Sequence, residues 1–389
     1  MIKTIFIILF IVSGFTIIWG MAGYNVSLKI LDKVFSRRKL EKDYTNKPFV
    51  TVLIVAHNEE KVIQKKLENV IINDYPSEKI EYIIASDHST DETNNIVQAF
   101  IEKHAKLNIL LYNTKEHGGK TNAQNESQKF AKGEILVMTD ANSMFEKNAI
   151  SELTACFTSP DIAYVTGRLR YINSDDNTTA NSESTYWESD LNQRNIESKI
   201  YSITAGNGAI YACRNELYHD FKSILCHDSY MPYYYAGLKK RSIYNSDACA
   251  TEKAGENVSD EFKRKVRMNR NIFTSIKMGI KSLNFLKYGW YSYFYFGHRT
   301  CRYLLWISHL VVFITNMLLF QDSIIWKVFL ILQILFYFLG IVGMITKSKN
   351  KVICLIYYYC MTVCAQWVGV YNVITGRAKP VWEKAESTR

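Results

Sequence analysis

Apolar residues in this chain are gathered into a few long runs near its two ends. Residues 5–18 are almost wholly apolar, and the other such runs are residues 304–320, 324–345 and 352–373. Each run approaches the ~20 residues that a helix needs to cross a bilayer. The sequence between the first run and the others has the mixed composition of a soluble protein. We therefore expect one soluble domain placed between membrane segments.

The runs and the charges beside them suggest six successive parts. We predict an N-terminal transmembrane anchor at residues 1–24, a basic juxtamembrane helix at 25–47, a soluble domain at 48–280, an interfacial amphipathic segment at 281–302, three transmembrane helices at 303–376 and a C-terminal tail at 377–389. A cleavable signal peptide is the alternative for the first run, but no A-x-A site follows it.

The formal net charge is +10, and the basic residues lie mainly beside the apolar runs. This is the pattern of cytoplasmic loops in membrane proteins, so the soluble domain is expected in the cytoplasm, with membrane lipids as partners. No basic-aromatic motif for nucleic acid occurs, and we expect no nucleic acid partner. Four spans would place the basic C-terminal tail on the side of the membrane opposite the cytoplasm, which conflicts with the charge pattern. Either one apolar segment is therefore re-entrant, or the tail departs from that pattern.

Strand and helix patterns alternate through the first half of the soluble domain. Strands are predicted at residues 49–56, 80–85, 107–112 and 135–138, of which the first and the last should be buried. An amphipathic helix is predicted at 57–73, and further helices at 92–104 and 121–131. Alternation of this kind is typical of βαβ units with a parallel sheet. We therefore predict an α/β fold.

Polar side chains follow three of these elements at the edge where ligands of such sheets bind. Asp87 follows the second strand, Asp140 and Asn142 follow the fourth, and Lys120 opens a helix after two glycines. Asp140 and Asn142, spaced i and i+2 on an extended backbone, would point the same way and suit a hard divalent cation. The alternative is a strand followed by an Asx turn. No GxGxxG or P-loop motif is present, so a nucleotide diphosphate held through a metal fits better than NAD or ATP hydrolysis.

Four segments in register resemble a known family. VTVLIVAHNEE, SDHSTDET, GGKTNAQN and TDAN resemble the nucleotide-binding half of family 2 of the glycosyltransferases, whose fold is GT-A. The subgroup that this chain resembles comprises membrane-bound enzymes related to poly-N-acetylglucosamine synthase, hyaluronan synthase and ceramide glucosyltransferase. The resemblance implies a GT-A domain inserted between transmembrane helices of a bacterial inner-membrane protein.

The resemblance also implies a donor site for a UDP-sugar with Mg²⁺ or Mn²⁺. Asp87 would contact the uracil, Lys120 would lie near the diphosphate, and the metal would be held by Asp140 and Asn142. The nucleoside pocket would be lined by Ala56, His57, Asn58 and Glu59. The chain departs from the family where Asn142 replaces the second Asp of Asp-x-Asp and His88 replaces a Gly. Because Asn is a neutral ligand, we expect a metal held by fewer charges.

The second half of the domain would receive the acceptor. A strand is predicted at residues 162–169 and a helix at 183–196 that carries Trp187 on the acceptor side, and the acceptor loop contains Gly206, Asn207 and Gly208. Asp228 matches the family's general base, which takes the proton of the acceptor hydroxyl. His227 replaces a neighbouring acid. A metal site of His219, Cys226 and His227 is the rival interpretation, and it lacks zinc-like spacing.

A basic segment stands where the processive enzymes carry QxxRW. Arg267 matches the Arg, and Arg264 and Met268 replace the Gln and the Trp. Arg264, Arg267 and Arg270 recur at three-residue spacing, on one helix face that could clamp the diphosphate. A basic helix lying on the membrane surface is the alternative.

These features predict a metal-dependent, inverting hexosyltransferase or N-acetylhexosaminyltransferase that extends a cell-surface polysaccharide. Transfer of one sugar to a lipid-linked acceptor is the alternative, which the loss of Gln and Trp favours. A catalytically dead nucleotide-binding subunit of a secretion complex, with other subunits as partners, is a third hypothesis.

Overall fold

The computed structural model describes residues 1–35, 38–172, 178–253, 258–346 and 350–381, with side chains left out for residues 178–187 and 258. The chain divides into two compact units. The apolar unit comprises residues 1–31, 175–187 and 256–378. The second unit comprises residues 32–174, 188–255 and 379–389, and we call it the catalytic unit because it contains most of the predicted glycosyltransferase domain. Each unit is therefore built from three separate pieces of the chain.

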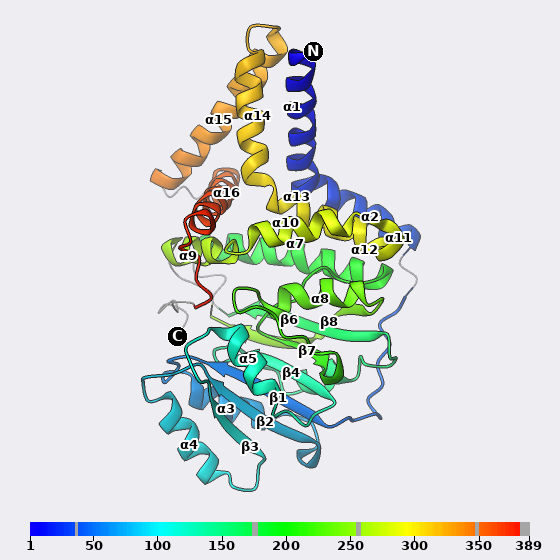
Figure 1. Cartoon of the computed structure of the whole chain (residues 1–389), viewed down its shortest axis with the longest axis vertical. Helices are drawn as coiled ribbons and strands as arrows, with labels where there is room; N and C mark the ends of the chain where they lie inside the picture. The colour runs from blue at the N-terminus through cyan, green and yellow to red at the C-terminus, as the bar shows by residue number, and fades with distance from the viewer. Residues whose placement is uncertain (36–37, 173–177, 254–257, 347–349, 382–389) are drawn as a thin grey trace. The chain divides into compact units, whose positions relative to one another are not determined.

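The apolar unit consists of helices (Figure 1). They are α1 (Ile2–Ile18), a π-helical turn (Trp19–Gly23), α2 (Tyr24–Phe35), α9 (Val258–Met268), α10 (Ile272–Ser282), α11 (Phe285–Tyr288), α12 (Trp290–Phe294), a second π-helical turn (Tyr295–Thr300), α13 (Cys301–Tyr303), α14 (Leu305–Leu319), α15 (Ile324–Thr346) and α16 (Lys351–Ile374). Within this unit α1 packs against α14, and α15 packs against α16.

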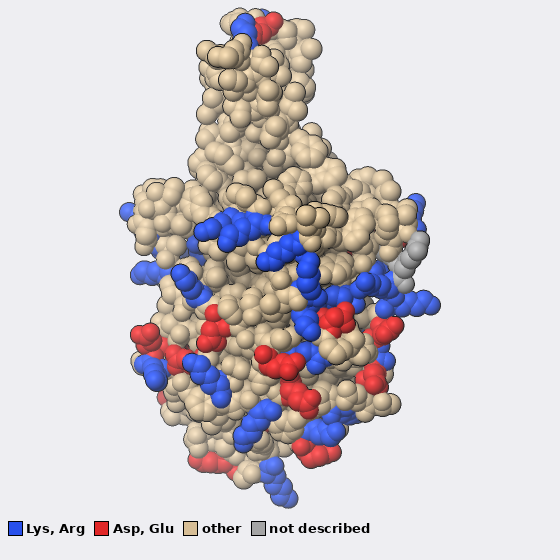
Figure 2. All heavy atoms as spheres, turned by 45° about the vertical axis from the view of Figure 1, so that its right-hand side comes forward, with Lys and Arg blue, Asp and Glu red and all other residues tan. Residues whose placement is uncertain are grey.

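Among the residues that the structure describes, three helices are long and apolar enough to cross a membrane, namely Ile2–Phe35, Ile324–Thr346 and Lys351–Ile374. A fourth span is possible if Trp290–Tyr303 and Leu305–Leu319 act together, although they meet at an angle of 64°. On the face shown in Figure 2 the surface over α1, α14 and α15 carries few charged side chains. Lys3 and Asp322 are paired at 2.6 Å near the ends of these helices. A largely uncharged helical surface suits contact with lipid.

The catalytic unit is built on an eight-stranded mixed sheet of order β3-β2-β1-β4-β7-β6-β8-β5. The strands are β1 (Val50–Ala56), β2 (Ile80–Ser86), β3 (Ile109–Asn113), β4 (Ile135–Asp140), β5 (Met144–Phe145), β6 (Ile162–Tyr171), β7 (Tyr211–Arg214) and β8 (Arg241–Glu252). β1 to β4 run parallel to one another, whereas β7 is antiparallel to both β4 and β6. The four predicted parallel strands are confirmed, and the second half makes the sheet mixed.

Helices cover the sheet and complete its core. They are α3 (Ile63–Ile71), α4 (Thr93–Lys103), α5 (Lys120–Gln128), α6 (Ala149–Thr154), α8 (His227–Gly237) and α7 (Thr178–Ile200), which continues from the apolar unit into the catalytic unit. β1 and β2 are buried along their whole length, because both strands lie inside the sheet with a neighbouring strand on each side.

The structure corrects several predicted elements. The helix expected from residue 57 begins at Ile63, because the backbone N–H groups of Asn58 and Glu59 donate to Ser89 and Thr93 instead. The helix expected over residues 25–47 ends at Phe35. Arg270 lies beyond the end of α9, so the predicted face of three arginines is wrong.

The interfacial segment predicted at residues 281–302 is a series of short helices broken at Gly289, whose φ is +55°. Lys42 also differs from its expected role beside the membrane. Its Nζ atom lies 2.6 Å from Glu152 and 2.7 Å from Asp247, both in the catalytic unit. Burial opposes the charged form of Lys42, but these two carboxylates outweigh it and raise its pKa. Lys42 is therefore a structural cation of the catalytic unit.

Candidate active site

The candidate site lies where the parallel strands β1, β2 and β4 end together. In the sheet register Ala56 pairs with Ser86, and Val55 pairs with Asp140. Ala56 is buried, and its carbonyl oxygen accepts a hydrogen bond from the backbone N–H of Asp87 at 2.8 Å. The strand ends therefore bring Ala56, Asp87 and Asp140 to one edge, as predicted for ligand sites of such sheets.

Asp87 is fully buried and holds the turn before α5. Its carboxylate accepts hydrogen bonds from the backbone N–H groups of Gly118 at 3.1 Å and Gly119 at 2.9 Å. His117 Nδ1 lies 2.9 Å from the same carboxylate. We call residues 117–120 the donor turn. The buried carboxylate fixes this turn, because it satisfies two backbone donors and one side chain at once.

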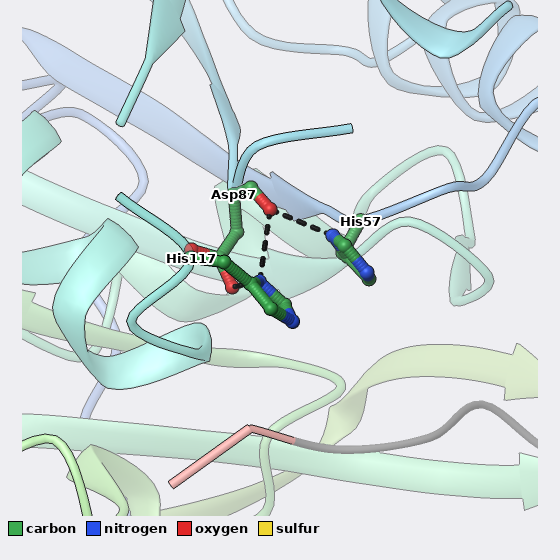
Figure 3. A group of neighbouring side chains, drawn as sticks. All are labelled: His57, Asp87 and His117. Carbon is green, nitrogen blue, oxygen red and sulfur yellow. Dashed lines mark hydrogen bonds and ion pairs between the residues drawn. The ribbon is translucent and has the colours of Figure 1, made fainter. Parts of the chain in front are cut away.

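His57 and His117 stack beside Asp87, as Figure 3 shows. The Nδ1 atom of His57 lies 2.6 Å from the backbone carbonyl oxygen of Asp87. A carbonyl oxygen only accepts, so this nitrogen carries the proton. Burial lowers the pKa of His57, although the hydrogen bond to Asp87 acts against that effect. The ring is therefore neutral near pH 7.

His57, Asp87 and His117 have ligand atoms within 4.8 Å of one another, and they are the group with metal-binding geometry in the described part of the chain. Their rings lie in nearly parallel planes, at 18°, with centroids 4.0 Å apart. Lone pairs lie in the ring planes, so two stacked rings do not aim at one ion. The group fits hydrogen bonding better than metal binding. The rival site of His219, Cys226 and His227 is not among the groups of this kind in the described residues.

Asn58 and Glu59 belong to the loop after β1. Asn58 has a φ of +54°, and its side-chain oxygen accepts a hydrogen bond from the backbone of Thr90 at 2.7 Å. His88, the other departure from the family pattern, also has a positive φ, of +58°. Glu59 is buried. The loops after β1 and β2 therefore brace each other around the site.

Lys120, Asp140, Gly208 and Asp228 converge at the centre of the site. Lys120 forms an ion pair with Asp140 and donates to the carbonyl oxygen of Gly208 at 3.3 Å. A Cβ atom on Gly208 would lie 2.6 Å from Lys120 Nζ, 3.4 Å from an Asp140 oxygen and 3.9 Å from the Asp228 carboxyl carbon. Burial opposes the charged form of Lys120, but Asp140 and Asp228 outweigh it and raise the pKa. Lys120 therefore keeps its positive charge between two carboxylates.

Asp140 and Asn142 present partly exposed oxygen atoms beside this cluster. Asp140 ends β4, and Asn142 lies in the turn that follows, so the predicted extended backbone does not continue through Asn142. One carboxylate and one amide oxygen are hard ligands of the type that Mg²⁺ and Mn²⁺ bind. These residues fit a divalent cation that is shared with a diphosphate.

The acceptor loop is held rigidly. Asn207 is buried, and it donates to the carbonyl oxygen of Gly167 at 2.8 Å and accepts from the backbone of Ile210 at 3.1 Å. The N–H of Gly206 donates to the carbonyl oxygen of Asp228 at 2.8 Å. Asp228 lies in the first turn of α8, and its carboxyl group is therefore tied through its backbone to the loop.

His227 does not act as a charged neighbour of Asp228. It is buried and packs against Tyr218 and Phe221, with ring centroids 5.1 Å and 5.2 Å away. Burial lowers the pKa of His227 to about 3, and the charge of Lys120 acts in the same direction. The ring is therefore neutral and serves the packing under α8.

The remaining predicted site residues lie elsewhere or outside the description. The side chain of Trp187 lies outside the described residues. Arg264 and Arg267 lie on α9 of the apolar unit. Arg264 forms an ion pair with Glu261 at 2.7 Å, and Glu261 also accepts from Tyr358 of α16 at 3.1 Å. Burial opposes the charged form of Glu261, yet Arg264 lowers its pKa below the ordinary value.

Lys66 is a buried residue near the site that the sequence analysis missed. It donates to Thr139 Oγ1 at 2.8 Å and to the carbonyl oxygen of Ser143, which flank the segment from Asp140 to Asn142. Ser143 in turn donates to Glu252. Its burial could have been predicted from helical spacing, because Lys66 follows Ile63 by three residues and therefore lies on the buried face of α3.

The sequence of this region is similar to that of glycosyltransferases. Residues 51–221 match the model of "Glycosyl transferase family 2". A beta-monoglucosyldiacylglycerol synthase of Nostoc is 30% identical over 168 residues, which cover 43% of this chain and 34% of that protein. A poly-beta-1,6-N-acetyl-D-glucosamine synthase of Staphylococcus epidermidis is 29% identical over 161 residues, which cover 41% of this chain and 38% of that protein. The matched regions thus span little more than a third of these relatives.

Among solved structures, a mannosyltransferase of Pyrobaculum calidifontis has a similar fold over nearly the whole chain. The TM-score is 0.72 at 18% identity, with 97% of this chain and 100% of that chain covered, and that protein was solved with GDP-mannose and Mn²⁺. This likeness confirms the predicted GT-A fold.

Proposed function

Because residues 51–221 form a domain of glycosyltransferase family 2, we propose that this protein is an inverting glycosyltransferase that moves a sugar from a UDP-sugar to a growing cell-surface polysaccharide at the membrane. The observation that carries the proposal is the convergence of Lys120, Asp140 and Asp228 around Gly208. Transfer of a sugar from a nucleotide diphosphate to a hydroxyl group needs a cation, a metal-binding carboxylate and a base within one site.

The donor would bind along the strand ends. Asp87 and the donor turn would shape the nucleoside pocket, together with Ala56, His57, Asn58 and Glu59. Lys120 would lie at the diphosphate, and Asp140 and Asn142 would hold Mg²⁺ or Mn²⁺. A bound cation would neutralise charge on the leaving diphosphate. Arg264 and Arg267 remain proposed donor-binding residues.

The acceptor would approach from the side of the loop that contains Gly206, Asn207 and Gly208, with Trp187 as a further acceptor-side residue. Asp228 would take the proton of the acceptor hydroxyl while the hydroxyl oxygen bonds to the anomeric carbon. The bond from that carbon to the diphosphate oxygen breaks, and its electron pair leaves with UDP. One displacement of this kind inverts the configuration of the anomeric carbon.

The candidate spans support a membrane setting. We propose an integral protein of the bacterial inner membrane with its catalytic unit in the cytoplasm, where nucleotide sugars are made available. A second candidate function is the transfer of a single sugar to a lipid-linked acceptor. The family match to a diacylglycerol glycolipid synthase favours it, and the chain length of the product separates the two.

The test measures UDP release from a panel of UDP-sugars by the purified full chain in detergent, with Mn²⁺ or Mg²⁺ and with lipid and oligosaccharide acceptors. We expect metal-dependent release from one sugar and a loss on the order of 10²–10⁴-fold in Asp228→Asn, which keeps the backbone contact to Gly206. Asp220→Asn is the matched control. Equal release by wild type and Asp228→Asn would place the base elsewhere, and binding of GDP rather than UDP would overturn the proposed donor.

A further inference from the structure

The C-terminal end of the described chain returns to the donor turn. A Cβ atom added to Gly119 would lie 2.7 Å from the carbonyl oxygen of Pro380 and 3.5 Å from the nitrogen of Val381. Pro380 and Val381 are partly buried, and residues 379–381 belong to the catalytic unit. The contact therefore joins two backbones at a distance that only glycine at position 119 permits.

Gly119 lies within the donor turn. This turn contacts residues at both ends of the proposed donor site. On one side the N–H groups of Gly118 and Gly119 donate to the buried carboxylate of Asp87. On the other side Lys120 pairs with Asp140. A segment that rests on Gly119 therefore acts on the nucleoside end and the diphosphate end of the site together.

The form of the contact favours support over obstruction. The Pro380 atoms nearest to Gly119 belong to its carbonyl group, whereas Lys120 makes its contacts with Asp140 and Gly208. The segment therefore meets the donor turn through its backbone. Proline also has a restricted φ, so it offers a stiff surface at little entropic cost.

We propose that residues 379–381 are a part of the donor site and that Pro380 is a positioning residue, which holds the donor turn in the arrangement that receives a nucleotide diphosphate. The assignment of the ligand rests on the proposed function. The contact with the turn does not, so the two can be tested apart.

The first experiment compares a full-length chain, a chain that ends after Ala378 and a control that ends after Val381. Hydrogen exchange of the Gly118 and Gly119 amides and the Kd of UDP with Mn²⁺ are measured for each. Without residues 379–381 we expect faster exchange and UDP binding that is weaker by about threefold to tenfold, since the turn is less preorganised. The control should match the full-length chain in both measurements.

The outcomes test the positioning role of residues 379–381 separately from the proposed UDP donor. Exchange and UDP binding that are equal in both shortened chains would overturn the positioning role, and tighter UDP binding without residues 379–381 would overturn it in favour of obstruction. Faster exchange with no UDP binding by any chain would keep the contact and reject the proposed donor.

A second experiment adds Gly119→Ala to the full-length chain and to the chain that ends after Ala378. In the full-length chain the new methyl group meets Pro380 and also sits at a φ of +86°. Only the unfavourable φ remains once the segment is removed. We expect the substitution to weaken UDP binding less in the shortened chain than in the full-length chain, whereas strictly additive effects would show that the segment does not press on Gly119.

Discussion

The Nζ atom of Lys66 lies 2.8 Å from Oγ1 of Thr139, the residue before Asp140. Lys66 is fully buried, and burial lowers its pKa to about 7, although Asp140 and Glu252 act in the opposite direction. The unfolded chain then binds more protons at this site than the folded chain between pH 7 and pH 10.5. The free energy of unfolding should therefore rise with pH across this window.

Replacing Lys66 by Met removes this dependence while it keeps the length of the side chain. Relative to Lys66→Met, the wild type should gain up to about 2–3 kcal/mol of stability between pH 7 and pH 9. The measurement is the thermal unfolding midpoint of both proteins in detergent across this range. Lys65→Met, at an exposed position of the same helix, should run parallel to wild type. Parallel curves for Lys66→Met would contradict the lowered pKa.

Gly206 lies against Tyr164 in the core of the acceptor loop. A Cβ atom at position 206 would lie 1.8 Å from the Tyr164 hydroxyl oxygen and 2.8 Å from its ring carbon Cζ. Gly206→Ala should therefore cost about 1–3 kcal/mol of stability through overpacking. Adding Tyr164→Phe should restore part of this loss, because it removes the closest atom. Thermal unfolding of the two single variants and the double variant tests the contact, and additive losses would contradict it.

The buried ring of His227 should make the protein sensitive to acid. Its pKa of about 3 lies below the ordinary value of 6.5, so the unfolded chain binds the proton first as pH falls. The stability from the neutral ring is present above pH 6.5 and is lost toward pH 3. His227→Phe should reduce the loss of stability below pH 6 by about 1.4 kcal/mol per pH unit.

The comparison needs thermal unfolding of wild type and His227→Phe between pH 7 and pH 5, with the more exposed His219→Phe as the control. Phe keeps the ring contacts with Tyr218 and Phe221. An equal response of wild type and His227→Phe to acid would mean that the ring is protonated in the folded state.

The number of carboxylate ligands at positions 140 and 142 should set the affinity of the proposed site for its metal ion. Asn142→Asp adds a negative ligand at a partly exposed position, so the Mn²⁺ concentration for half-maximal UDP release should fall about threefold to tenfold. Asp140→Asn should raise that concentration or abolish release. An unchanged Mn²⁺ dependence in both variants would place the cation elsewhere or remove it from the reaction.

The sequence was sufficient for the four parallel strands β1 to β4. Apolar runs such as residues 49–56 predict buried strands, and Asp87 and Asp140 lie at the carboxyl ends of such runs. The order and direction of the later strands could not be read, because β7 and β6 pair through contacts between residues far apart in the chain. The first helix was placed too early because the loop at Asn58 takes a positive φ that the helical spacing does not reveal.

Within the site, the sequence predicted which residues lie at strand ends, but it did not predict which side chains contact each other. Nothing near Lys66 in the sequence indicates that its charge meets Thr139, since the two residues lie on different elements. The contact of His117 with Asp87 likewise depends on the sheet, which brings the ends of separate elements together. The same holds for Pro380, whose neighbour Gly119 lies far earlier in the chain.

The division of the chain into two units limits how the protein can be taken apart. Both units are assembled from three pieces, so the backbone passes from one to the other after residues 31, 174, 187, 255 and 378. No single cut yields a complete catalytic unit. A fragment of residues 48–280 would lose the piece from residue 379 and would carry the apolar pieces 175–187 and 256–280 without their partners. A fragment that ends at residue 280 is therefore incomplete in both units.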